Sequence, residues 1–150
     1  MCEQPRFSAD RNLGRLAKWL RLLGFDTRYL RASTKAGLLA ERDAGRIVLT
    51  RLTSLKGQPG VVFVAANDPA EQLAAVIREL HLSAEPMLSR CSRCNAELVA
   101  ATPEEVEGLV PEHVRLTQRE FLRCPSCLRI YWPGSHVERM RERVRPPQAD

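Results

Sequence analysis

The sequence predicts an α/β domain with a mostly parallel sheet and flanking helices, followed by a smaller cysteine-bearing domain. In the first half of the chain, short apolar segments without polar alternation are separated by segments of helical periodicity, a pattern typical of strands covered on both faces. The second half holds four cysteines in two pairs of equal spacing. We therefore expect an α/β domain over residues 1–84, a cysteine-bearing domain over 85–138 and a tail over 139–150.

The first predicted unit is a short strand at 6–9 followed by an amphipathic helix over 11–23, which Gly24 ends. Apolar residues share one face of this helix. Four basic residues share much of the opposite face: Arg11, Arg15, Lys18 and Arg21. This face is either simply solvated or a phosphate-binding surface. Its position directly after Asp10 is the reason to consider phosphate binding.

Five further elements complete the predicted α/β domain. They are a strand at 26–30, a helix at 35–44, strands at 46–50 and 61–65, and a helix over 69–80. The two later strands are continuous apolar runs, and glycine or proline lies near their ends. The resulting order, β-α-β-α-β-β-α, favours a parallel sheet covered by helices.

Two aspartates follow predicted strands directly, which makes them candidates for one ligand site. Ligands of open α/β sheets bind beyond the carboxyl ends of the strands. Asp10 and Asp68 are therefore expected to face one crevice, beside the basic face of the first helix. Each also has a structural alternative, because Asp10 precedes a predicted helix and Asp68 before Pro69 is typical of a helix N-cap.

The overall charge favours anionic partners. The chain carries 23 lysines and arginines against 18 acidic residues, a formal net charge of +5, and arginine predominates. Guanidinium groups suit phosphate recognition, so nucleic acid is the obvious candidate, although a mildly basic protein is the simpler alternative. No apolar run approaches the roughly 20 residues that span a bilayer, and the N-terminus lacks a signal-peptide core. We expect a cytoplasmic location.

The four paired cysteines predict one structural zinc site. Cys91 and Cys94 form one C-x-x-C pair, Cys124 and Cys127 form another, and 29 residues separate the pairs. This spacing lets each pair supply two thiolates from one tight turn, and two such turns complete a tetrahedral sulfur site with no open position. Disulfides and an iron–sulfur cluster are the alternatives. Cys2 lies outside the pattern and is interpreted as a bystander thiol.

The zinc ribbon is expected to contain short strands at 97–101 and 130–132, with a helix start within 103–109. A domain of this size buries little apolar surface, so zinc would supply much of its folding free energy. Tyr131, Trp132 and His136 either form a contact patch for a protein partner or have structural and surface roles. For Tyr131 and Trp132, that structural role is completing the ribbon core.

Several segments together resemble the Mut-seven C-terminal ribonuclease domain family. In chain order they are FSADRNLGRLAKWLRLLGFDT, GRIVLTR, DPAEQL and the two C-x-x-C turns, which close with YWPGSH. The resemblance covers residues 6 to about 140 and implies a PIN-like nuclease fold joined to a zinc ribbon. It also implies RNA cleavage by carboxylate-held Mg²⁺ or Mn²⁺, with the metal activating water and stabilising phosphoryl charge.

The acidic site that the resemblance implies is incomplete in this chain. Asp10 matches the first acid of the family. The second acid usually lies where this chain has Ser33, Thr34 and Lys35, and a further acid usually follows the Thr-Arg pair, where this chain has Leu52. Either nearby acids replace them or the catalytic metal site is lost. The nearby acids are Glu41, Asp43 and Asp68.

Two functions follow as hypotheses. A metal-dependent ribonuclease would use Asp10 as a metal ligand and Asp68 as a possible second. A catalytically inactive RNA-binding or protein-docking module would need no acid cluster. In either case the four basic residues of the first helix would neutralise RNA phosphates.

Overall fold

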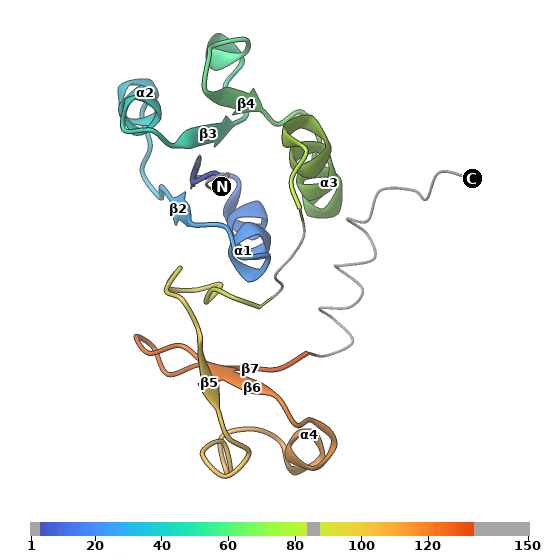
Figure 1. Cartoon of the computed structure of the whole chain (residues 1–150). Coiled ribbons are helices and arrows are strands. Elements are labelled where there is room, and N and C mark those ends of the chain that lie inside the picture. Colours follow the sequence, from blue (N-terminus) through green and yellow to red (C-terminus); the bar gives the residue numbers. More distant parts are fainter. Residues whose placement is uncertain (1–3, 84–87, 134–150) are drawn as a thin grey trace, which may run out of the picture.

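A computed structural model of the chain describes residues 4–83 and 88–133 (Figure 1). The first segment contains β1 (Phe7–Ala9), α1 (Gly14–Leu22), β2 (Thr27–Tyr29), α2 (Lys35–Asp43), β3 (Ile47–Thr50), the 3-10 turn η1 (Thr53–Leu55), β4 (Val61–Phe63) and α3 (Pro69–Leu80). All strand pairs are parallel, in the order β2-β1-β3-β4. This arrangement confirms the predicted α/β class and element order.

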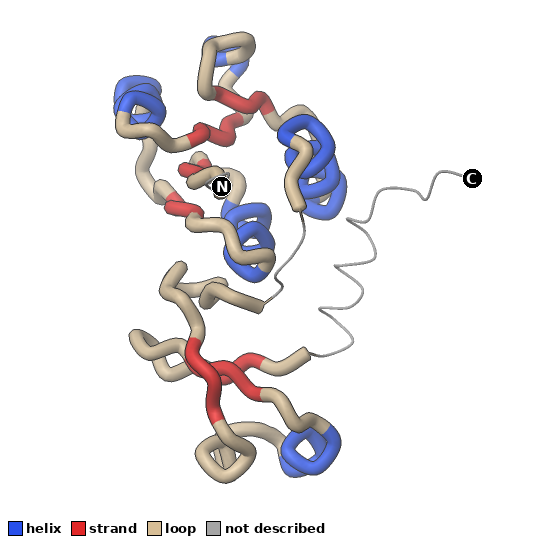
Figure 2. The backbone as a smooth tube through the Cα atoms, viewed as in Figure 1, coloured by secondary structure: helices blue, strands red, loops and turns tan. Residues whose placement is uncertain are grey.

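The helices cover both faces of the parallel sheet (Figure 2). α1 and α3 pack together on one face, where Leu16, Leu20 and Leu73 are fully buried. α2 covers the other face, where Leu38 packs in a smaller cluster with Val48. The chain leaves β1 toward one side and β3 toward the other, so the carboxyl ends of these two central strands flank the expected ligand crevice.

The first helix begins later than predicted, at Gly14 rather than residue 11. A turn precedes the helix, in which Leu13 N donates to Asp10 O at 2.9 Å, and the hydroxyl of Tyr29 donates a hydrogen bond to the backbone oxygen of Arg11 in this turn. Leu13 is the N-cap, with no capping side chain. Asp10 is therefore not the helix cap, whereas Asp68 does cap α3 by accepting a hydrogen bond from Glu71 N at 3.2 Å.

The second segment is a three-stranded antiparallel sheet with one short helix. Its elements are β5 (Val99–Ala101), α4 (Glu112–Thr117), β6 (Phe121–Arg123) and β7 (Ile130–Tyr131), with strand order β5-β6-β7. The helix start predicted within 103–109 is wrong, since these residues form turns and Gly108 takes a φ of 80° that a right-handed helix cannot use. β6 and α4 were not predicted.

A small apolar cluster holds the second segment together, with Val106 and Phe121 buried at its centre. Trp132 is partly buried against this cluster, so it completes the ribbon core. His136 and the predicted tail lie outside the described residues, as does the predicted boundary near residue 84.

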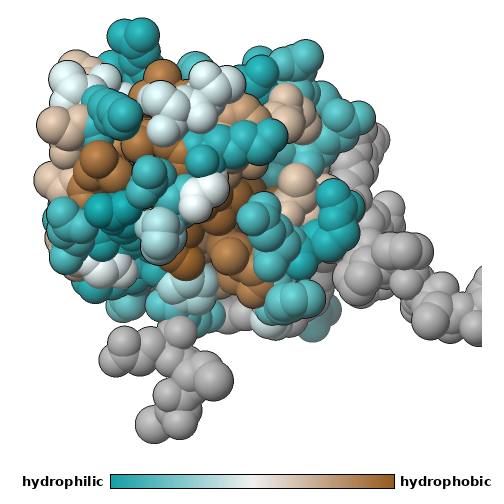
Figure 3. Space-filling model, turned by 90° about the horizontal axis from the view of Figure 1, so that it is seen from above, coloured by the Kyte–Doolittle hydropathy of each residue, from teal (hydrophilic) through white to brown (hydrophobic). Residues whose placement is uncertain are grey.

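On the face shown in Figure 3, hydrophilic side chains surround the apolar residues that show at the surface. Of the large hydrophobic side chains described in the α/β domain, Leu52 is the strongly exposed one, at 40%. Within the described residues no helix is both long and apolar enough to cross a membrane.

Candidate functional site

Asp10 lies at the carboxyl end of β1, where the sequence placed the catalytic candidate. Asp10 is only 5% exposed, and both of its carboxylate oxygens accept hydrogen bonds. Thr50 Oγ1 donates to Oδ2 at 2.7 Å, while Oδ1 accepts from Arg11 N at 2.8 Å and from the hydroxyl of Ser33. The carboxylate is thus held by two hydroxyls and an amide from three separate segments.

The sheet topology explains this convergence. β1 and β3 are neighbours, so Thr50 at the end of β3 lies beside the residue that follows β1. Ser33 lies just before α2, on the connection from the other neighbour, β2. Sequence reasoning missed both hydroxyl partners. Their positions could have indicated a contact, because Thr50 ends a strand and Ser33 lies in a loop just before a helix. Hydroxyl residues are common at such positions, however, so this indication is weak.

The other candidate acids are engaged elsewhere. Asp68 is exposed at the start of α3, and β4 is two strands from β1, about 10 Å across the sheet. Glu41 pairs with Arg28 at 3.2 Å, and Asp43 pairs with its neighbour in α2. Within residues 4–83 and 88–133, only the four cysteines form a group of three or more His, Cys, Asp or Glu side chains suited to share an ion.

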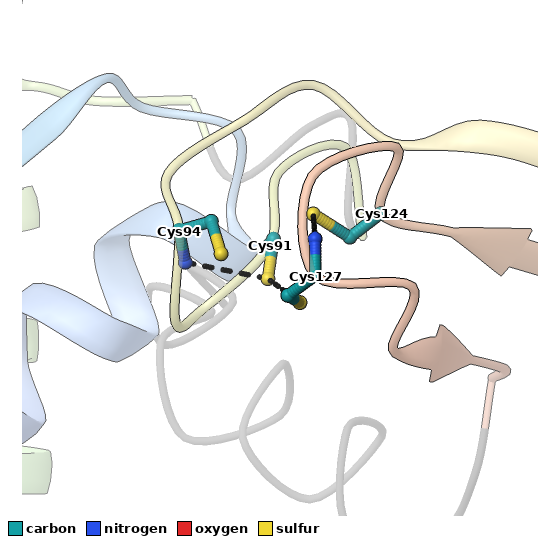
Figure 4. Close-up of side chains that lie close together, drawn as sticks. All are labelled: Cys91, Cys94, Cys124 and Cys127. Carbon is teal, nitrogen blue, oxygen red and sulfur yellow. Dashed lines mark hydrogen bonds between the residues drawn. The ribbon is translucent and has the colours of Figure 1, made fainter.

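The four predicted cysteines converge between two turns of the second segment (Figure 4). The sulfurs of Cys91, Cys94, Cys124 and Cys127 all lie within 4.8 Å of one another. The Cys91 and Cys127 sulfurs are 3.7 Å apart. A tetrahedron with Zn–S bonds of about 2.3 Å has sulfur–sulfur edges of about 3.8 Å, so the cluster fits a tetrahedral zinc site.

Both cysteine turns have the same local structure. In the first, Cys94 N donates to Cys91 Sγ at 3.4 Å, and Asn95 takes a φ of 65°. In the second, Cys127 N donates to Cys124 Sγ at 3.4 Å, and Leu128 takes a φ of 66°. The equal C-x-x-C spacing therefore produces two equivalent turns, each directing its thiols and an amide to one point.

The environment of the thiols favours metal binding. Burial opposes ionisation of Cys91, but hydrogen bonds from Tyr131 and from the amide of Cys94 outweigh it and lower the pKa of Cys91 to about 7. The hydrogen bond with Cys127, together with burial and neighbouring thiolates, raises the pKa of Cys94 to about 11. Such a cluster cannot ionise fully alone, whereas a bound cation would stabilise all four thiolates.

The hydroxyl of Tyr131 lies against the first cysteine turn. It is 3.2 Å from Cys91 Sγ and accepts a hydrogen bond from Ser92 N at 3.1 Å. Tyr131 is thus a partner of the sulfur site and is only partly exposed, which favours the structural role over the alternative of a contact patch at this residue.

The basic residues predicted on the first helix take two kinds of position. Arg11, Arg15 and Lys18 are exposed. Arg21 is half-buried and binds across the two segments, because its Nη1 donates to Ser92 O at 2.9 Å and its Nε donates to Thr27 O at 2.8 Å. Its burial lowers the pKa of Arg21, against the opposing effect of nearby acidic groups such as Cys91.

A second polar connection joins the segments at the edge strand β2. The side chain of Asn95 accepts from Thr27 N at 3.0 Å and donates to Asp26 Oδ1 at 2.7 Å. Asp26 in turn pairs with buried Arg46, at 2.8 Å. The hydrogen bond from Arg46, with support from Asn95, lowers the pKa of Asp26 to about 2 against partial burial. Sequence reasoning missed this chain of contacts.

The comparison with protein families agrees with the earlier resemblance. The family model described as Mut7-C RNAse domain matches residues 5–144, which is most of the chain and includes both segments. Searches of curated proteins and of solved structures gave no match.

Proposed function

The chain belongs to the Mut7-C RNase domain family, and from this premise we propose that the protein binds RNA without cleaving it. In this proposal the α/β domain contacts RNA, and zinc at the four cysteines stabilises the ribbon. Membership of a ribonuclease family implies an RNA partner, and the excess of arginine supplies the positive charge that phosphate binding needs.

The state of Asp10 is the observation that carries the proposal. The ribonuclease chemistry that the family resemblance implies uses a cluster of carboxylates to hold the metal ion and to balance its charge. The partners of Asp10 are instead hydroxyls and an amide. The positions at which the resemblance implies further acids hold hydroxyl and basic residues at 33–35 and exposed Leu52. This arrangement suits a carboxylate that supports loop structure.

A binding and cleavage assay on the full chain tests the proposal. We expect single-stranded RNA to bind with an affinity that falls as salt rises, and to remain intact with or without Mn²⁺. Asp43→Asn is a charge-matched control for Asp10→Asn, because Asp43 is exposed in α2. Absence of RNA binding would refute the proposal.

Metal-dependent ribonuclease activity is the second candidate, and the position of Asp10 favours it. This carboxylate lies where ligand sites of open α/β sheets are found. In this function Asp10 would hold Mg²⁺ or Mn²⁺, which would activate water and stabilise phosphoryl charge, while Asp68 would have to leave its capping position to serve as a second ligand. Cleavage that requires Mn²⁺ and is lost in Asp10→Asn but kept in Asp43→Asn would establish this function.

The sulfur geometry supports a structural zinc ion in the ribbon. Four thiolates would fill its coordination shell and leave no position for water or substrate. We expect one zinc per chain by elemental analysis, and none after replacement of Cys124. A reducing compartment such as the cytoplasm, the location expected from the sequence, would keep these thiols free to bind the metal. A protein partner for the ribbon stays a prediction and would now use exposed residues such as Leu109 and Leu116.

A further inference from the structure

A cleft of about 700 Å³ lies between α1 and the two cysteine turns. Both segments contribute to its wall, with α1 and the region after β2 on one side and residues of the ribbon on the other. No acidic residue is among those that line it. Six of the lining residues are basic: Arg15, Lys18, Arg21, Arg31, Arg93 and Arg129. We call this feature the basic cleft.

The positive charges of the basic cleft are largely uncompensated. Apart from Arg21, its basic residues are exposed, and their side chains make no ion pair or hydrogen bond within the described part of the chain. Elsewhere in the described structure Arg28, Arg46 and Arg90 each have an acidic partner. Gathering unpaired like charges does not stabilise a fold, but it concentrates a positive field on an anionic ligand.

The basic residues that the ribbon contributes to the cleft lie in or next to the cysteine turns. Arg93 lies between Cys91 and Cys94, and Arg129 lies two residues after Cys127, where its backbone oxygen accepts from Cys124 N at 2.9 Å. The sulfur site therefore positions the backbone of both arginines. A zinc ion with four thiolates carries a net charge of about −2, which offsets only part of the six positive charges.

We propose that the basic cleft is a composite binding site for the phosphate backbone of single-stranded RNA, assembled by metal binding in the ribbon. This inference rests on the RNA binding proposed above, and it extends the binding surface from the first helix to both domains. Arg15, Lys18 and Arg31 bind phosphates from one wall, and Arg93 and Arg129 bind from the other. Arg21 holds the walls together through its bonds to Ser92 and Arg93 backbone oxygens.

The predominance of arginine favours phosphate as the ligand over the carboxylates of an acidic protein. Both anions accept paired hydrogen bonds from guanidinium, but phosphodiesters recur at regular intervals along a flexible chain. The partly exposed ring of Tyr29 also lines the cleft, which offers a surface for base stacking. Phosphate contacts carry no sequence information, so we expect similar affinity for oligouridylate and oligoadenylate.

The test compares two double variants by fluorescence anisotropy with labelled oligouridylate across a potassium chloride series. Arg93→Gln with Arg129→Gln removes two charges from the ribbon wall. The matched control, Arg78→Gln with Arg119→Gln, removes two exposed charges that do not line the cleft. We expect the cleft variant to bind about tenfold more weakly, with the slope of log K against log salt reduced by about 1.4, and the control to match the wild type.

A variant of the opposite wall covers the case in which the ribbon variant loses zinc. Lys18→Gln with Arg31→Gln leaves the cysteine turns untouched and should reduce the slope equally. Stripping the metal with a chelator should weaken binding at least as much as the ribbon variant does.

The outcomes separate this inference from the proposed function. If the wild type binds RNA, and either cleft variant binds with the same affinity and the same slope of log K against log salt, the composite site is overturned and RNA binding stands. Absence of wild-type RNA binding would overturn both. Tighter binding of polyglutamate than of RNA would indicate an acidic protein partner and overturn the proposal as well.

Discussion

Replacing Asp26 with asparagine should destabilise the α/β domain, because it would leave a buried arginine without its counter-charge. The side chain of Arg46 is only 5% exposed, and its Nη2 lies 2.8 Å from Asp26 Oδ1. Removing one partner of a buried ion pair typically costs about 3–5 kcal/mol. Arg46 keeps hydrogen bonds to Phe7 O and Ser8 Oγ, and Asp26 is 28% exposed. We therefore expect about 2–3 kcal/mol.

Urea denaturation followed by the fluorescence of Trp19 measures this loss. Trp19 packs against the core of the α/β domain, and the second tryptophan, Trp132, packs in the ribbon. Changing Trp132 to phenylalanine in every variant restricts the signal to the α/β domain. Asp43→Asn removes an equal charge at a side chain that is 70% exposed and should cost less than about 0.5 kcal/mol.

The pH dependence provides an independent check on the same contact. The pKa of Asp26 falls from 3.8 to about 2 on folding, through the hydrogen bond from Arg46 first and that from Asn95 second. A carboxyl group whose pKa is lowered by folding stabilises the folded state when the pH is above the pKa of the unfolded state. This stabilisation is lost as the pH falls through the pKa of the folded state. The difference between wild type and Asp26→Asn should therefore be constant near neutrality, narrow as pH falls through 3.8 and disappear only below pH 2. A variant as stable as Asp43→Asn at neutral pH, or a difference at pH 2 as large as the one at neutral pH, would refute the reasoning.

Two further predictions concern the ribbon and a tight turn. Cys124→Ser should abolish zinc binding and unfold the ribbon, which elemental analysis and the fluorescence of Trp132 would measure. Cys2→Ser should keep both the zinc content and the folded ribbon. Gly60→Ala should lower the melting temperature more than Gly57→Ala does. Both positions have positive φ, but a Cβ at Gly60 would lie 2.7 Å from Arg42 Cγ while one at Gly57 meets nothing within 4 Å. Equal melting temperatures would contradict the steric argument.

Features specified by local sequence were predictable. The Asp68-Pro69 pair defines the start of α3, since the aspartate side chain caps the first turn and proline suits the first helical position. The cysteine turns were equally accessible, because two residues between thiols specify one compact turn wherever it occurs. Both predictions depend on residues that lie within a few positions of one another.

Individual side-chain contacts between distant segments were not predictable. The turn that replaces the predicted first residues of α1 is in contact with Tyr29, whose hydroxyl donates to the backbone oxygen of Arg11 from 18 positions away. The hydroxyl partners of Asp10 come from 23 and 40 positions along the chain, and nothing in the local sequence of Ser33 or Thr50 indicates a contact with this carboxylate. Periodicity places a residue on a face of its own element, but it does not determine which residue of another element that face meets.

The polar contacts between the two segments explain how metal binding would change the shape of the basic cleft and leave its number of charges the same. Asn95 joins the edge strand β2 from within the first cysteine turn, at a backbone φ of 65°. Arg21 reaches the same turn at Ser92 O. Each bond depends on the conformation of that turn, and without metal four thiols crowd into a space in which they cannot all ionise. Loss of the metal would therefore release the turn, and with it the wall that carries Arg93, although the number of basic residues would not change.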